Sequence, residues 1–181
     1  MPASPPRPFA QPERGVLPAL ALILAADILL ANHDLSRPVE ALLDEPAHLA
    51  TAFLLLAALP APRARPFVLG VALGALGIDA DHVPGELGFD IITRGTGRPV
   101  THSLATCAAL LLLSRALPDP VRAVTAGAAS GVLAHFARDL GTGGLPLLWP
   151  VSKRRVRIPY AAYLAILGVA GGGVWWRARS R

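Results

Sequence analysis

The sequence predicts an all-α fold, a polytopic transmembrane helical bundle with about four to six membrane helices. First, 53% of the 181 residues are hydrophobic and 16% are charged, which is too apolar for an ordinary soluble domain. Second, only 6% are aromatic, so the apolar residues are mainly Leu, Ala and Val, as in helices that pack against lipid and one another. Third, the apolar segments lack the alternating polar residues of membrane-spanning strands.

Each apolar segment is a candidate helix, and the segments cover residues 16–31, 47–60, 66–78, 103–117, 121–137 and 160–176. A full span needs about 20 residues, whereas the second and third segments offer only about 14 and 13. Their helices therefore either extend into the flanking polar residues or enter the bilayer part-way. Prolines between the second and third segments, and "LPDP" between the fourth and fifth, predict tight helical hairpins.

The domain organisation follows from the same pattern. Residues 1–15 contain five prolines and are predicted to be a disordered tail. Residues 16–176 are predicted to form a single membrane-embedded, hydrolase-like helical domain, and residues 177–181 a basic tail. No convincing signal-peptide cleavage site follows the first apolar segment, so we expect that segment to be retained.

The net charge of +5 does not indicate nucleic-acid binding, because the arginines lie mostly beside apolar segments, where they anchor helix ends at lipid headgroups. We expect membrane lipid as a partner and no nucleic acid. With the N-terminus inside and six spans, the short connectors hold nine basic residues inside and eight outside. This near tie leaves the orientation open.

Histidines and carboxylates recur at the ends of the apolar segments, on the side that an alternating bundle brings to one face. These residues are His48, Asp79, Asp81, His82, His102, His135 and Asp139. His135 and Asp139 are four apart, which on a helix sets both side chains on one face. His48 follows Pro46 and His102 precedes the fourth segment, so both are predicted to stand at helix starts.

Four histidines and three carboxylates without a thiolate suit zinc, manganese or iron, with zinc the first expectation. The single cysteine, Cys107, lies in an apolar run and excludes both a disulfide and a cysteine-based zinc site. A lone histidine at a membrane interface usually serves as an amphipathic side chain, but a cluster of ionisable groups near hydrocarbon favours a compensating cation. Seven ligands suffice for one or two divalent ions, which suit hydrolysis.

The motifs "GIDADH", "RPVTHS" and "GVLAHFARDLGTGGLPLLWPVSKRRVRIPY" resemble the YdjM-like family of inner-membrane metal-dependent hydrolases, of the LexA-regulated type. The resemblance covers residues 46–159 and maps the family's histidine and aspartate motifs onto the seven residues above. It implies a multi-pass protein of the bacterial inner membrane and a hydrolase whose substrate is unassigned. One family histidine, five residues before the "THS" histidine, falls on Gly97 here.

Together these observations predict a membrane-bound, metal-dependent hydrolase that acts on a phosphoester or other ester of an amphiphilic or lipid-associated substrate, through water activated by the metal. Asp81 or Asp139 is the general base, and the sequence does not choose between them. Arg98, Lys153 and Arg154 are candidates to hold a phosphate or lipid headgroup, with interfacial anchoring as the alternative.

The rival hypothesis is a non-catalytic metal-binding membrane protein or a transporter. Transporter sites tend to lie near the membrane midplane on broken helices. The predicted ligands instead stand at segment ends, and this position favours the hydrolase.

Overall fold

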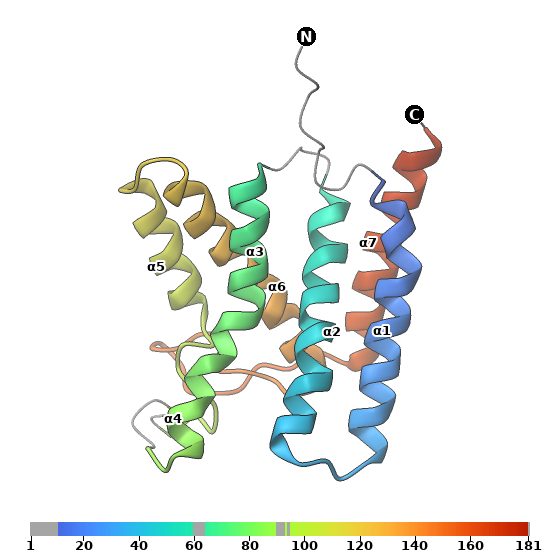
Figure 1. Ribbon diagram of the computed structural model, residues 1–181. Coiled ribbons are helices and arrows are strands. Elements are labelled where there is room, and N and C mark those ends of the chain that lie inside the picture. Colours follow the sequence, from blue (N-terminus) through green and yellow to red (C-terminus); the bar gives the residue numbers. More distant parts are fainter. Residues whose placement is uncertain (1–10, 60–63, 90–92, 94, 181) are drawn as a thin grey trace.

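A computed structural model describes residues 11–59, 64–89, 93 and 95–180, and these residues form a helical bundle (Figure 1). The described chain has no strand beyond an isolated bridge between Leu145 and Val156. Its elements in order are α1 (Glu13–Asn32), α2 (Arg37–Ala58), α3 (Arg65–Gly77), the 3-10 turn η1 (Ile78–Asp81), α4 (His82–Glu86), α5 (Leu104–Arg115), α6 (Val121–Thr142) and α7 (Tyr160–Arg179). The predicted all-α bundle is confirmed.

Three segments are long and apolar enough to cross a membrane, and they are Glu13–Asn32, Pro38–Ala58 and Arg65–Pro84. The third of these includes α3, η1 and the first turn of α4, so the short apolar segment predicted at 66–78 continues into its polar flank. Of the two alternatives for the short segments, the helices take the first and extend beyond their apolar residues.

The predicted tails are shorter than expected where the structure describes them. Residues 1–10 and 181 lie outside the described residues. Glu13 opens α1 three residues before the predicted boundary, because an acidic residue in the first turn stabilises the positive end of the helix dipole. Arg177 and Arg179 belong to the last turn of α7, where basic side chains stabilise the negative end.

The second helix begins ten residues earlier than its apolar segment. Pro38 occupies the first turn of α2, where a missing backbone N–H costs nothing, and Ser36 precedes the helix. Pro46 therefore lies inside α2 and does not start it. The prediction that His48 stands at a helix start is wrong, and His48 lies in the interior of a helix of 22 residues.

Small residues let α3 and α6 approach one another closely. A Cβ at Gly70 or Gly74 would collide with a backbone carbonyl of α6, and a Cβ at Gly127 or Gly131 with one of α3. Such close backbone approach at small residues is typical of helix pairs in membranes. It holds the end of α3 against the middle of α6, where His135 lies.

The other helices pack on both sides of this pair. In Figure 1 α5 lies beside α3 and α6, while α2, α1 and α7 form the opposite half of the bundle. Val16, Ile23, Leu54 and Leu167 are fully buried in the core shared by α1, α2 and α7. The candidate site lies between the two halves, where α2 and α6 meet.

Candidate metal centre

Two groups of ligand side chains form inside the bundle, each with its ligand atoms within 4.8 Å of one another. The first group is Asp79, Asp81, His82 and His102, and the second is His48, His135 and Asp139. The structure therefore brings together all seven residues that the sequence indicated. They come from α2, η1, α4, α6 and the turn before α5, and we call them the His–Asp centre.

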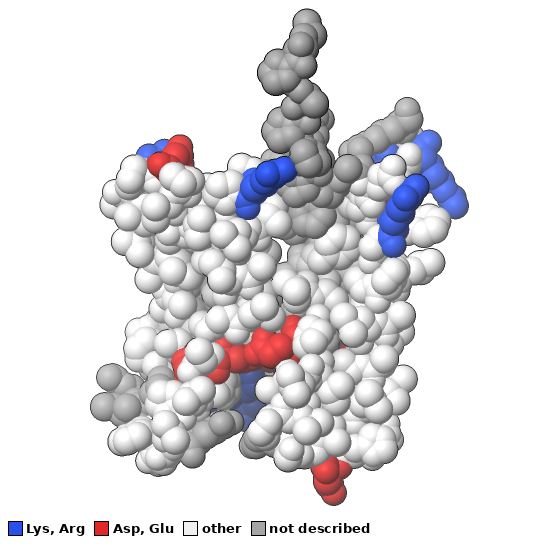
Figure 2. All heavy atoms as spheres, viewed as in Figure 1, with Lys and Arg blue, Asp and Glu red and all other residues white. Residues whose placement is uncertain are grey.

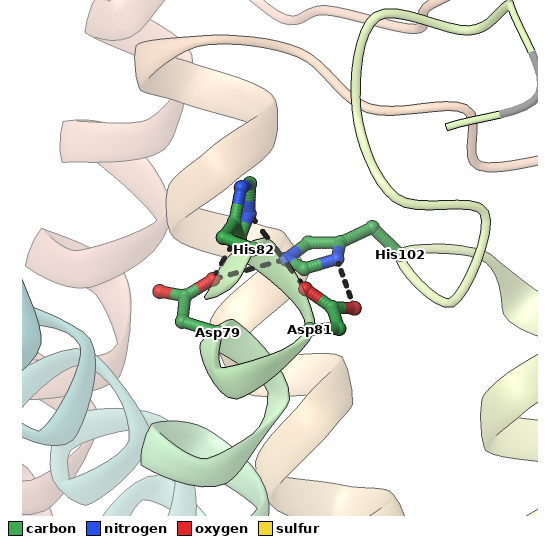
Figure 3. A group of neighbouring side chains, drawn as sticks. All are labelled: Asp79, Asp81, His82 and His102. Carbon is green, nitrogen blue, oxygen red and sulfur yellow. Dashed lines mark hydrogen bonds and ion pairs between the residues drawn. The ribbon is translucent and has the colours of Figure 1, made fainter. Parts of the chain in front are cut away.

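The first group is built around the imidazole of His102, which lies between two carboxylates (Figure 3). Its Nε2 is 3.1 Å from Asp79 Oδ1 and its Nδ1 is 3.2 Å from Asp81 Oδ2. His82 Nε2 approaches the same Asp79 oxygen at 3.4 Å. The 3-10 turn η1 accounts for this arrangement, because its tight winding places the carboxylates of Asp79 and Asp81 beside the same imidazole ring.

The second group joins two helix interiors. The rings of His48 on α2 and His135 on α6 stack with centroids 3.6 Å apart and planes 7° from parallel. Asp139, one turn after His135, lies 3.5 Å from His135 Nε2 and 3.9 Å from His48 Nε2. His135 Nδ1 is 2.8 Å from the carbonyl oxygen of Ala75, an interaction that turns Nε2 towards the centre.

Further contacts join the two groups into one centre. His135 Nε2 lies 3.4 Å from Asp79 Oδ1, and His102 Nε2 lies 3.8 Å from Asp139 Oδ2. His48, His102 and His135 are each 1% exposed or less, and Asp139 is 2% exposed. Buried imidazoles and carboxylates at these distances form a continuous set of nitrogen and oxygen donors.

Several of these donor atoms are buried without a hydrogen-bond partner among the described residues. They are both ring nitrogens of His48, Nε2 of His135 and Oδ1 of Asp81. An unsatisfied buried polar atom costs about 1–3 kcal/mol, so four together in one small region require compensation. The donor set, without a thiolate, fits one or two divalent transition metals such as zinc, manganese or iron.

The electrostatics of His102 also depend on the two carboxylates. Burial by itself would lower the pKa of His102, but the hydrogen bonds to Asp79 and Asp81 outweigh it and raise that pKa above its ordinary value. Thr101 donates a further hydrogen bond to Asp81 from its hydroxyl. The two carboxylates therefore favour positive charge at the ring of His102.

Two carboxylates beside the centre were missed by the sequence interpretation. Asp44 Oδ2 lies 3.3 Å from His48 Nε2, and Glu45 carries a buried oxygen without a partner among the described residues. The sequence spacing could have indicated Asp44, because Asp44 and His48 are four residues apart on α2, as His135 and Asp139 are on α6. Pro46 between them concealed it by suggesting that the helix began there.

A buried arginine ties the first helix to this region. Arg138 is 0% exposed, and its Nη2 donates to Asp27 on α1 and to Asp44 on α2, each at 2.6 Å. Asp27 also accepts a 2.5 Å hydrogen bond from the Tyr160 hydroxyl of α7. Asp27 thus joins α1 to α6 and α7 through these contacts.

The predicted substrate-binding cations divide into two kinds. Arg98 lies at the centre, with Nη1 donating to Asp139 Oδ2 at 2.6 Å. Lys153 and Arg154 make no ion pair with the centre in the described part of the chain. Their neighbour Arg155 instead donates to the carbonyl oxygens of Gly143 and Gly144, at 2.7 and 3.1 Å.

Residues 43–180 match the family model for YdjM inner membrane protein. This chain belongs to the YdjM family. The matched residues include the whole His–Asp centre, so the family resemblance predicted from the sequence motifs is confirmed. No curated protein and no solved structure matches the chain.

Gly97 replaces the histidine expected from the YdjM-like pattern. Its φ of 71° lies in the left-handed region, which a side chain other than glycine adopts only at a cost. A Cβ at this position would face open space. The turn before Arg98 therefore uses the conformational freedom of glycine.

A cavity of about 1020 Å³ adjoins the His–Asp centre of this YdjM-family protein. Asp79, His82 and Asp139 of the centre line it. Arg98 and Arg157 supply positive charge, and α1, which lies outside the matched residues, supplies apolar side chains. The centre is thus accessible from a space large enough for more than a small ion.

Proposed function

We propose that this protein is a multi-pass, membrane-bound metal-dependent hydrolase of the inner membrane, acting on a phosphoester or other ester of an amphiphilic substrate. One observation carries the proposal: seven histidine and aspartate side chains converge on one centre, in which several buried donor atoms have no hydrogen-bond partner among the described residues. The adjoining cavity, with Arg98 and Arg157 in its lining, supports an anionic substrate.

The residues of the His–Asp centre would hold one or two divalent ions, with zinc as the first expectation. When bound, such ions activate water near neutral pH and stabilise negative charge that develops on an ester. Arg98 lines the cavity and orients an anionic group beside the centre through its guanidinium.

The geometry supports Asp81 as the general base. Asp139 Oδ2 already accepts a hydrogen bond from Arg98 at 2.6 Å and lies 3.5 Å from His135 Nε2. Asp81 Oδ1 instead has no hydrogen-bond partner among the described residues and lies 3.9 Å from His82 Nε2, while Oδ2 is held by Thr101 and His102. A carboxylate fixed through one oxygen and open at the other suits proton transfer from water.

A metal transporter or non-catalytic metal carrier is the second candidate, and two observations favour it. His48 and His135 lie inside helices and not at their ends. Asp79 and Asp81 lie on η1, which interrupts the path from α3 to α4. Sites on broken helices away from the membrane surface are typical of transporters.

Both candidate functions require bound metal, so the metal content of the purified chain tests them together. We expect one or two divalent transition-metal ions per chain by elemental analysis, and loss of metal in His135→Ala and Asp139→Ala. His33→Ala is the matched control, because His33 is the histidine outside the centre. A well-folded wild-type chain without metal after incubation with zinc would eliminate both candidates.

A substrate screen then separates the two candidates. The metal-loaded chain is assayed with phosphomonoester, phosphodiester and carboxylester substrates, and in liposomes for zinc uptake. Hydrolysis that falls by at least about a hundredfold in Asp81→Asn, with metal retained, supports the hydrolase. Zinc uptake without hydrolysis of any of the three classes supports the transporter.

A further inference from the structure

The cavity beside the His–Asp centre is amphipathic in a defined direction. Its polar side contains Asp79, His82 and Asp139 of the centre. Helix α1 forms another wall, to which it contributes the apolar side chains of Leu24, Ile28 and Ala31 besides those of Asp27 and Asn32. A site for a small hydrophilic substrate has no need of such a wall.

The wall on α1 is a regular helical stripe. Leu24, Ile28 and Ala31 are spaced by four and three residues, so they stand on one face of the helix. Leu24 is 42% exposed and Ile28 is 62% exposed, although both face a cavity that also contains charged groups. Val83 of α4, 51% exposed, adds an apolar side chain to the lining.

The wall is fixed in place by a polar anchor within the same stripe. Asp27, between Leu24 and Ile28, is bound to Arg138 of α6 and to Tyr160 of α7. Arg138 in turn holds Asp44 beside His48. The apolar wall and the His–Asp centre therefore have a fixed distance and orientation relative to each other.

The cationic residues define the chemistry of the other end of the occupant. Arg98 contacts the centre through Asp139, and Arg157 lines the cavity without an ion pair among the described residues. The cavity is also lined by carboxylates outside the centre, such as Glu40 and Glu45, whose charge bound divalent ions would offset. Two guanidinium groups beside such ions favour a doubly charged anion over a neutral carboxylic ester. A terminal phosphate monoester carries that double negative charge.

The access route is consistent with a substrate dissolved in the bilayer. In Figure 2 acidic atoms gather in a hollow at a level between the two ends of the molecule, with recessed basic atoms directly below them and uncharged surface above. The hollow lies between the α2 side and the α3 to α4 side of the bundle (Figure 1). A chain that stays in lipid can reach such an opening from the side.

We propose that the substrate is the phosphate monoester of a lipid, with its phosphate between the His–Asp centre and Arg157 and its hydrocarbon chain along Leu24, Ile28 and Ala31. This inference rests on the proposed function for the reaction and assigns the substrate class. Water adds to phosphorus as the bond to the lipid oxygen breaks. Asp81 takes the proton from water, the departing lipid oxygen receives it, and inorganic phosphate and the lipid alcohol leave.

Binding of two non-hydrolysable phosphonates tests where the chain lies. The metal-loaded full chain, in nanodiscs of a zwitterionic phosphodiester lipid, is titrated with dodecylphosphonate and with methylphosphonate. Ile28→Trp places a larger side chain in the cavity beside α1 and narrows the space for a hydrocarbon chain. Leu17→Trp is the matched control, since Leu17 lies on the same helix, is also 62% exposed and is not among the residues that line the cavity. Partition of dodecylphosphonate into the bilayer is common to all three proteins.

We expect the affinity ratio of dodecylphosphonate to methylphosphonate to fall about tenfold in Ile28→Trp, the equivalent of roughly two buried methylene groups. Leu17→Trp leaves the ratio at the wild-type value. Arg157→Gln weakens both phosphonates by about tenfold and preserves the ratio. A ratio unchanged in Ile28→Trp, or no binding of dodecylphosphonate to the wild type, overturns the proposal.

Phosphate release from dodecyl phosphate and from p-nitrophenyl phosphate separates this inference from the proposed function. Turnover of the short substrate with no preference for the long chain refutes the lipid assignment and leaves the hydrolase intact. Chain-dependent binding that is sensitive to Ile28→Trp, with no phosphate released from either substrate, supports the lipid site and refutes the hydrolase.

Discussion

His48 and His135 show how much a single side chain depends on its partner across the bundle. Each is buried in a helix interior, and the two rings stack while their nitrogens face aspartates from different elements. A histidine in such a position without a cation leaves ring nitrogens unsatisfied, as both nitrogens of His48 are. For the proposed metal site, the protonation state of each histidine therefore sets how strongly the centre can bind a cation.

The pKa of His102 predicts the pH dependence of metal binding. Its pKa is raised, despite burial, by Asp79 and Asp81, so in the metal-free chain the proton on His102 persists above the usual titration range of histidine. Metal requires the neutral ring, and zinc affinity should rise by up to about tenfold per pH unit for each proton released. Titrations with zinc between about pH 6 and pH 8 measure the slope.

The same shift has a consequence for the metal-free chain. A raised pKa in the folded state contributes stability below the ordinary pKa of histidine and loses it as pH rises through the folded value. Thermal stability of the metal-free chain should therefore fall over the pH range in which metal affinity rises. His102→Gln removes one ionisable ring and should flatten both dependences, and identical slopes in wild type and His102→Gln would contradict the assignment.

At the scale of elements, the crossing of α3 and α6 sets the position of the centre. The glycines of both helices let the backbones approach, and the approach brings the Ala75 carbonyl within 2.8 Å of His135 Nδ1. Asp79, just beyond the end of α3, then faces His135 Nε2. The interruption of α3 by η1 turns two carboxylates towards a histidine from the turn before α5.

Substitution of a glycine in this crossing should disturb both the fold and the site. Gly131→Val places side-chain atoms against the backbone of α3, and overpacking of this kind costs about 1–3 kcal/mol. Gly168→Val on α7 is the matched control, because a Cβ there meets no other atom within 4 Å. Thermal unfolding in detergent and bound zinc measure the two effects, and equal stability of the two variants would show that the crossing tolerates separation.

At the scale of the whole molecule, the charges separate along the bundle. Helix α1 begins and α7 ends at the same end, and Figure 2 shows basic atoms there, with the recessed acidic atoms further along. Arg98 and Arg138, which the sequence counted among basic residues of the other side, are engaged by carboxylates of the site region. Without these two arginines, the short connectors hold nine basic residues on the side of the termini and six on the other side.

This distribution predicts that the end with both termini is cytoplasmic. Single cysteines introduced as Asp34→Cys and Ser180→Cys report the two ends, because both positions are exposed and the native Cys107 is buried. A membrane-impermeant maleimide should label Asp34→Cys in intact cells whose outer membrane has been made permeable. It should label Ser180→Cys only after lysis, and the reverse pattern would invert the orientation.

The sequence by itself determined the helices and the seven members of the His–Asp centre. Apolar runs broken by prolines predict helices wherever they occur, and six of the observed helices begin or end within a few residues of the predicted segments, apart from the early start of α2. Seven histidine and aspartate residues at segment ends were sufficient to predict one site, since buried ionisable groups have few stable alternatives to clustering around a cation.

Only the tertiary structure decided how these residues meet. The order of residues along the chain does not give the distance between α2 and α6. The stacking of His48 on His135, the position of Asp44 beside His48 and the contact of Arg138 with Asp27 of α1 therefore follow from packing across the bundle. Lys153 and Arg154 belong to the same sequence motif as Arg157, but among the three only Arg157 lines the cavity. Helix periodicity is a property of neighbours along the chain, but a binding cavity is formed by residues that only the fold makes neighbours.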